Sequence, residues 1–137
     1  MAANTAPIYS RLSDVQWIVA SISNTTKDLT SGTIYLVWTA DSTNGGFLDQ
    51  VVFQPFGTNT ASVARVWLNN GSATGTAANN TMLKDVTLAA TTNSETAQIG
   101  QTSVTIGAAI PASYRVYVTL GTGVAAGFHI YAIAGKY

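Results

Sequence analysis

The sequence of 137 residues contains no cysteine and a single histidine, His129. Without cysteine the chain can form neither disulfide bridges nor thiolate metal sites. A metal centre built from imidazole and carboxylate groups needs several such ligands converging on one point, and one histidine does not supply them. We therefore expect no metal and no cofactor, and we expect His129 to be a packed or interface residue.

Charged residues are also scarce. Lys, Arg, Asp and Glu make up 9% of the chain, with six basic residues balancing six acidic ones. Binding to nucleic-acid phosphates or to an anionic membrane surface requires clustered Lys and Arg, so we expect neither partner. A neutral surface opposes self-association only weakly. The composition therefore favours a homo-oligomer over a monomer kept soluble by hydroxyl and amide groups.

Long apolar runs are missing as well, since none approaches the ~20 residues of a membrane-spanning helix. The stretch MAANTAPIYSRLSD, residues 1–14, lacks the basic and apolar regions of a secretory signal. We therefore expect synthesis in a reducing cytoplasm. With its proline and little periodicity, this stretch is predicted to be an extended N-terminal arm, terminal fraying being the alternative.

Short segments with a period of two dominate the rest of the chain. The predicted strands are 15–22, 33–40, 47–56, 62–69, 82–89, a looser stretch around 96–106, 114–120, and a last strand that starts at residue 128. About eight antiparallel strands separated by Gly, Asn and Thr turns predict one all-β domain over residues 15–137. We expect a single-domain β-sandwich of the jelly-roll type.

The last strand, FHIYAIAGKY, is apolar on both faces. One face carries Phe128, Ile130, Ala132 and Ala134, and the other carries His129, Tyr131 and Ile133. A sandwich strand gives only one face to the interior, so a second cover is needed. A neighbouring subunit is our hypothesis, with a loop or the arm of the same chain as the alternative. The residues predicted at the subunit interface are Phe128, Ile130, Tyr131, Ile133, Tyr117 and Trp67.

Motifs for catalysis are not found. The chain has no G-x-S-x-G motif for a nucleophilic serine, and GTGVAAG at 121–127 lacks the lysine and the following helix of a phosphate-binding loop. Asp41 and Asp49 flank a turn, and paired carboxylates can hydrolyse glycosidic bonds. Acidic residues beside turns usually cap them, however, so we do not expect an enzyme.

The aromatic residues suggest a second function. A stacking platform for sugar rings could be built from Trp17, Trp38, Trp67, Tyr35, Tyr114, Tyr117 and Tyr131. Each tryptophan lies in an alternating strand beside branched aliphatic residues, and this placement is more typical of a core or a subunit interface. A carbohydrate-binding jelly-roll module therefore stays the alternative.

Two segments, VARVWLNNGSATGTAANN at 63–80 and PASYRVYVTLGTGVAAGFHIYAIAGKY at 111–137, resemble small virion proteins of tailed bacteriophages. Several of these Thr/Ala/Gly-rich β proteins act as capsid decoration, or cement, proteins. The resemblance implies a homotrimer on the virion surface that binds the major capsid protein from outside, after synthesis in the host cytoplasm. A tail or head-fibre component is the alternative within the virion. We assign capsid contact to arm residues Pro7, Ile8, Tyr9 and Arg11.

Overall fold

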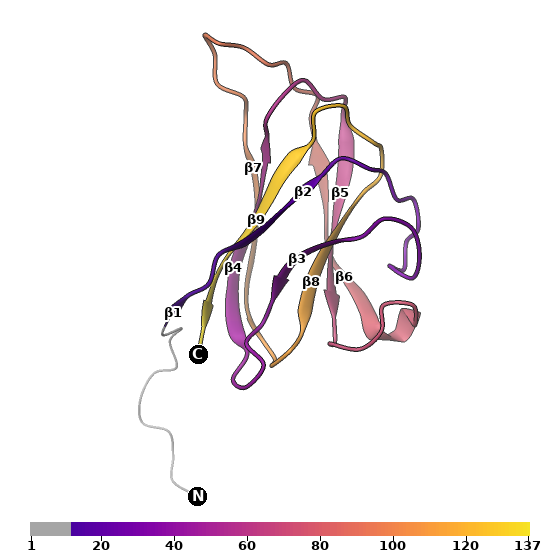
Figure 1. Cartoon of the computed structure of the whole chain (residues 1–137), viewed down its shortest axis with the longest axis vertical. Coiled ribbons are helices and arrows are strands. Elements are labelled where there is room, and N and C mark those ends of the chain that lie inside the picture. Colours follow the sequence, from indigo (N-terminus) through magenta and orange to yellow (C-terminus); the bar gives the residue numbers. More distant parts are fainter. Residues whose placement is uncertain (1–11) are drawn as a thin grey trace, which may run out of the picture.

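The computed structural model describes residues 12–137, and within them the chain is all-β, as predicted (Figure 1). The strands are β1 Leu12–Ser13, β2 Gln16–Ala20, β3 Tyr35–Thr39, β4 Gly46–Pro55, β5 Ser62–Asn69, β6 Asn80–Leu88, β7 Thr102–Ile110, β8 Arg115–Leu120 and β9 Phe128–Lys136. A turn of 3-10 helix, η1 (Ala77–Asn79), precedes β6. In this part of the chain no helix has the length and apolar character to cross a membrane.

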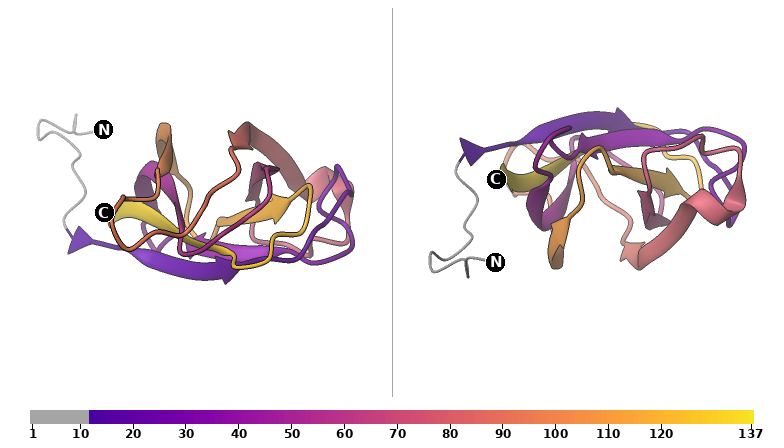
Figure 2. Two further views of the ribbon diagram at one scale, coloured as in Figure 1. Left: turned by 90° about the horizontal axis from the view of Figure 1, so that it is seen from above. Right: turned by 90° about the horizontal axis from the view of Figure 1, so that it is seen from below.

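The strands form two antiparallel sheets. Sheet A has the order β1-β9-β4-β7, and β2 pairs with β9 next to β1. Sheet B has the order β3-β8-β5-β6. Seen end-on, the sheets form two layers, and they approach each other most closely along β2 and β3 (Figure 2). The prediction of two packed antiparallel layers is therefore confirmed.

The main hydrophobic core lies between the two sheets and follows from the alternation in the strands. Its largest fully buried side chains are Trp38, Phe53, Phe128, Leu48, Leu88, Leu120 and Ile130. Burying a side chain of this kind contributes about 1.5–3 kcal/mol. In β9 the row that starts at Phe128 faces this core, and His129 on the opposite row is exposed. Towards β6 and β7 the core thins, because Leu83 and Ile106 are only partly buried.

Side chains close the sandwich along β2 and β3. The amide of Gln16 in β2 accepts a hydrogen bond from the Thr39 N–H at 3.1 Å and donates to the Thr39 carbonyl at 3.3 Å. Further along, the Tyr35 hydroxyl accepts from the backbone N–H of Ser21 at 3.2 Å and of Ile22 at 2.9 Å. The edges of β2 and β3 are therefore linked by side chains that replace a backbone ladder.

A buried asparagine holds the loops at one end of the sandwich. Asn59 is 3% exposed, and its Oδ1 accepts from the N–H of Ala126 at 2.9 Å and of Gly127 at 2.8 Å. Its Nδ2 donates to the Gly127 carbonyl at 2.9 Å, and its backbone pairs with Thr91. One side chain thus fixes the turn that leads into β9.

The predicted arm falls largely outside the described residues. This applies to the four residues assigned to capsid contact, Pro7, Ile8, Tyr9 and Arg11. Of the remaining arm residues, Leu12 and Ser13 form β1 and lie opposite Lys136 and Gly135 of β9. The role of the arm stays a prediction.

Candidate interaction surface

Part of the outer face of sheet B, over Trp67 and Tyr117, is covered by the chain itself. Leu29, in the connection between β2 and β3, is fully buried and packs on Trp67 and Tyr117. Leu29 adopts a positive φ of 65°, a left-handed conformation that costs a bulky residue some backbone strain. These three residues form a second hydrophobic cluster, separate from the main core.

Asn24 holds this connection in place. Its Nδ2 donates to the carbonyls of Ser31 at 2.7 Å and Thr33 at 3.0 Å, and its Oδ1 accepts from the Thr26 N–H at 2.9 Å. Asn24 is 4% exposed, so these bonds are shielded from water. The loop is therefore a fixed cover for sheet B.

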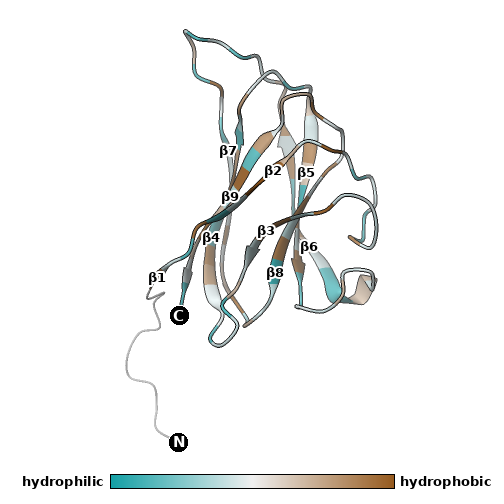
Figure 3. Cartoon of the chain, viewed as in Figure 1, coloured by the Kyte–Doolittle hydropathy of each residue, from teal (hydrophilic) through white to brown (hydrophobic). Residues whose placement is uncertain are grey.

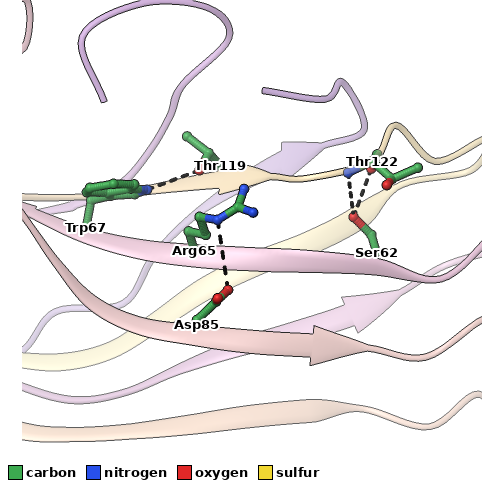
Figure 4. A network of polar contacts seen from close by, with 6 residues as sticks. All are labelled: Ser62, Arg65, Trp67, Asp85, Thr119 and Thr122. Atoms are coloured by element: carbon green, nitrogen blue, oxygen red, sulfur yellow. Dashed lines mark hydrogen bonds and ion pairs between the residues drawn. The ribbon is translucent and has the colours of Figure 1, made fainter. Parts of the chain in front are cut away.

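Side chains of β5 make polar contacts with β6, β8 and the turn after β8 (Figure 4). Figure 4 pairs Trp67 with Thr119, Arg65 with Asp85, and Ser62 with Thr122. The Trp67 indole N–H donates to Thr119 Oγ1 at 3.1 Å, so this buried aromatic is satisfied inside the subunit. The 4.0 Å contact of Arg65 with Asp85 contributes little, because the Asp85 side chain is 59% exposed.

These observations correct four of the six predicted interface residues. Phe128 and Ile130 belong to the main core, and Tyr117 and Trp67 lie under Leu29. Each is at most 8% exposed within one subunit, so a neighbouring subunit does not cover them. For Trp67 and Tyr117 the physical reason is that the connection between β2 and β3 folds back over sheet B. For Phe128 and Ile130 it is that their row of β9 faces the core between the sheets.

Within residues 12–137 no loop covers the outer face of sheet A at β2. Trp17 in β2 is 69% exposed, and Val15 and Val19 on the same row are 47% and 46% exposed. Trp17 lies directly opposite Tyr131 of β9, and both Tyr131 and Ile133 are half-buried. We call these five residues, Val15, Trp17, Val19, Tyr131 and Ile133, the Trp17 face. Figure 3 shows hydrophobic residues along β2 and β9.

Polar side chains border the Trp17 face on the side of β4 and β7. Gln101 Nε2 donates to the Tyr131 hydroxyl at 2.9 Å and to Gln54 Oε1 at 3.2 Å. At one end, the ring of the exposed His129 lies 4.4 Å from that of Phe56. The result is an apolar centre with an amide and imidazole rim, which is the usual anatomy of a protein interaction surface.

The aromatic residues considered for sugar binding are divided by the fold. Trp38 and Trp67 are 0% and 3% exposed, and the Tyr35 hydroxyl is engaged by backbone N–H groups. Trp17 alone of the three tryptophans is exposed, beside Tyr131. The sequence-based hypothesis did not single out Trp17 as an interface residue. Both alternating rows of side chains in β2 are apolar, so the sequence pattern does not show which row faces the core.

Asp41 and Asp49, the two carboxylates considered for catalysis, lie in a turn and in an exposed part of a strand. Asp41 Oδ1 accepts from the N–H of Asn44 at 2.9 Å and of Thr43 at 3.0 Å, so Asp41 caps its turn, and these bonds lower the pKa of its carboxyl group. Asp49 is exposed in β4, at the irregularity between Leu48 and Gln50. Within residues 12–137 no three His, Cys, Asp or Glu side chains are placed to hold a metal ion.

Two small cavities lie among the described residues. One of about 200 Å³ lies near Pro55, Leu88 and Gly100, and another of about 160 Å³ lies near Asn70, Asn79 and Tyr114. Both are smaller than the roughly 300–1,000 Å³ typical of ligand pockets. Comparison with known proteins finds no matching family model, no matching curated sequence and no matching solved structure.

Proposed function

We propose that the protein is a non-enzymatic structural virion protein, a capsid decoration (cement) protein that binds the outside of a phage head. The Trp17 face is the observation that carries this proposal. The chain covers Trp67 and Tyr117 on the outer face of sheet B with its own loop, yet leaves Trp17 69% exposed on sheet A. A contiguous exposed apolar face on a small domain indicates a binding partner.

The strand order supports a jelly roll as the fold of this subunit. The row β2-β9-β4-β7 packs against the row β3-β8-β5-β6, and the chain passes between the sheets at β2 to β3, β3 to β4, β4 to β5, β6 to β7, β7 to β8 and β8 to β9. Jelly rolls of eight strands are common in viral capsid proteins and in lectins. The fold thus suits both candidate functions and decides for neither.

The mechanism follows from mass action. A protein that binds the assembled shell and not its free subunits stabilises the shell by RT ln(1 + [L]/Kd), which is about 2.7 kcal/mol per site at a concentration of 100 Kd. A trimer that contacts several major capsid protein subunits at once gains further through avidity. The N-terminal arm, with Pro7, Ile8, Tyr9 and Arg11, is our proposed contact with the shell.

The test uses phage heads assembled without this protein. Purified protein is added, the heads are sedimented, and the bound protein and the temperature of shell disruption are measured. We expect saturable binding and a higher disruption temperature. Removing residues 1–11, which leaves β1 and β2 intact, should weaken attachment with no loss of the fold. Binding to tails and not heads would move the protein to the tail, and no virion binding would overturn the proposal.

A carbohydrate-binding module is the second candidate, and one observation favours it. Exposed Trp17 lies across from Tyr131, whose hydroxyl is held by Gln101, and an aromatic ring beside amide groups can bind a sugar ring. Titration with soluble oligosaccharides, followed by tryptophan fluorescence, tests this candidate. Saturable quenching that is absent in Trp17→Ala would support it.

A further inference from the structure

We infer that the Trp17 face is covered by a second copy of this chain, which makes it the subunit interface of a homo-oligomer. This inference rests on the proposed function as a structural subunit and names the partner of its exposed face. It also relocates the predicted interface. Of the six residues predicted, Tyr131 and Ile133 lie on this face, and Trp17, Val15 and Val19 join them.

The surroundings of β2 define how the copy approaches. Extending sheet A sideways at β2 would require a strand beside an edge that is already linked to β3, through Gln16 with Thr39 and through Tyr35 with Ser21. The outer face carries no such links. The second copy therefore packs over the face of sheet A and does not continue the sheet.

The charge distribution points to a second copy as the occupant. Trp17, Val15, Val19, Tyr131 and Ile133 are all uncharged, and so are Gln50 and Gln54, which lie opposite Ile133 and His129 on β4. The exposed Asp49 lies beside Gln50, at the border of the face. A contact around a symmetry axis brings each residue close to its own equivalent, so any charge would meet a like charge. A partner selected by charge would instead require complementary charges on this face. A neutral face fits its own copy.

The face forms the apolar centre of such a contact. Val15, Trp17 and Val19 are 47%, 69% and 46% exposed, and contiguous apolar patches of this kind are often functional. A standard interface takes about 800 Å² from each partner, and the polar rim of Gln54, Gln101 and His129 supplies further area. Trp17 stands at the centre of the row and is the most exposed member, which is the usual position of a residue that dominates binding.

The experiment measures solution mass by light scattering behind a sizing column, for wild type, Trp17→Ala and Leu36→Ala. Leu36 is the matched control, because it is 42% exposed and lies on β3 of the other sheet. We expect a closed oligomer for wild type and Leu36→Ala. For Trp17→Ala we expect self-association weakened by roughly 30-fold or more, as for loss of a central tryptophan. A second variant, Val15→Lys, should dissociate the oligomer by placing like charges across the axis.

A complementary measurement is acrylamide quenching of tryptophan fluorescence. Trp38 and Trp67 are buried in the subunit, so the quenching by acrylamide comes from Trp17. This quenching should decrease as the protein concentration is raised, because association shields Trp17. A wild-type monomer at high concentration would overturn the inference. A Trp17→Ala protein that keeps the oligomer would also overturn it. If that variant had in addition lost head binding, the face would be assigned to the shell. In that last case the proposed function would still stand.

Discussion

Oδ2 of Asp14 accepts a 3.0 Å hydrogen bond from the indole Nε1 of Trp38. Trp38 is completely buried, so this carboxylate satisfies a polar atom that has left water. Both oxygens of Asp14 also accept from Gln16 Nε2, at 3.2 and 3.1 Å, and Gln16 in turn binds Thr39. The start of sheet A is thereby fixed to sheet B.

Substituting Asp14→Ala should lower the free energy of unfolding by about 1–3 kcal/mol, the cost of leaving a buried N–H without a partner. Urea unfolding followed by circular dichroism measures this change. Asp14→Asn is the matched control, because it keeps an acceptor oxygen for Trp38, and its loss should be smaller. Equal losses for the two variants would contradict a hydrogen bond as the cause.

Removing the cover of sheet B should also be costly. Leu29→Ala deletes a fully buried side chain from its contacts with Trp67 and Tyr117, and a Leu→Ala change in such a place costs about 2–5 kcal/mol. Thermal unfolding measures the loss, and the fluorescence of Trp67 should shift to the red as water reaches it. Leu12→Ala, at a 65% exposed site on β1 of the other sheet, should leave both unchanged. An unshifted spectrum for Leu29→Ala would show that the loop does not shield Trp67.

Much of the fold follows from local patterns. The strand predicted at 62–69 coincides with β5, and the row that starts at Phe128 faces the core as alternation requires. The stretch predicted around 96–106 is β7 at Thr102–Ile110. The shift arises because Gly107, with a φ of 61°, and the neighbouring small residues weaken the strand pattern, although β7 pairs with β4 through them with a change of register.

The covers of the two sheets are harder to predict. Burial of Trp67 depends on Leu29, which lies in a polar connection, adopts a positive φ and is held there by Asn24. Nothing in the local sequence shows over which sheet that connection folds. The same limit applies to Trp17, because Val15 and Val19 alternate with the equally apolar Ile18 and Ala20. Only the pairing of β2 with β9 shows which row faces outward.

Asn59 should be essential for the turn before β9. In Asn59→Ala the N–H groups of Ala126 and Gly127 and the Gly127 carbonyl lose their partners, so we expect a loss of about 3 kcal/mol, given about 1–3 kcal/mol for each buried group left unsatisfied. Hydrogen exchange at Gly127 should accelerate together with the loss of stability. Asn93→Ala, at an exposed position, is the control. Slow exchange at Gly127 in the Asn59→Ala protein would contradict this assignment.

Acid should weaken the fold partly through Asp41. The N–H groups of Asn44 and Thr43, helped by the charge of Lys136, hold the pKa of the Asp41 carboxyl below its ordinary value of 3.8. Because the native state favours the ionised form, this contribution to stability is fully present above pH 3.8 and is lost as the pH falls through the lowered native pKa.

In Asp41→Asn that ionisation is removed, so its free energy of unfolding should fall less steeply below pH 3.8 than that of the wild type. Urea unfolding at a series of acidic pH values measures the two slopes. The same test applies to Asp28, on the loop that covers sheet B, because hydrogen bonds from Thr30 lower its pKa. Asp41→Asn and Asp28→Asn should each reduce the fall in the free energy of unfolding at acidic pH. Their effects should add, since the two groups cap separate turns. If the slope of Asp41→Asn matched that of the wild type, the cap at Asn44 and Thr43 would contribute nothing to acid stability, and the turn would be held instead by the bonds from the Gly45 and Ser113 N–H groups to the Asp41 carbonyl.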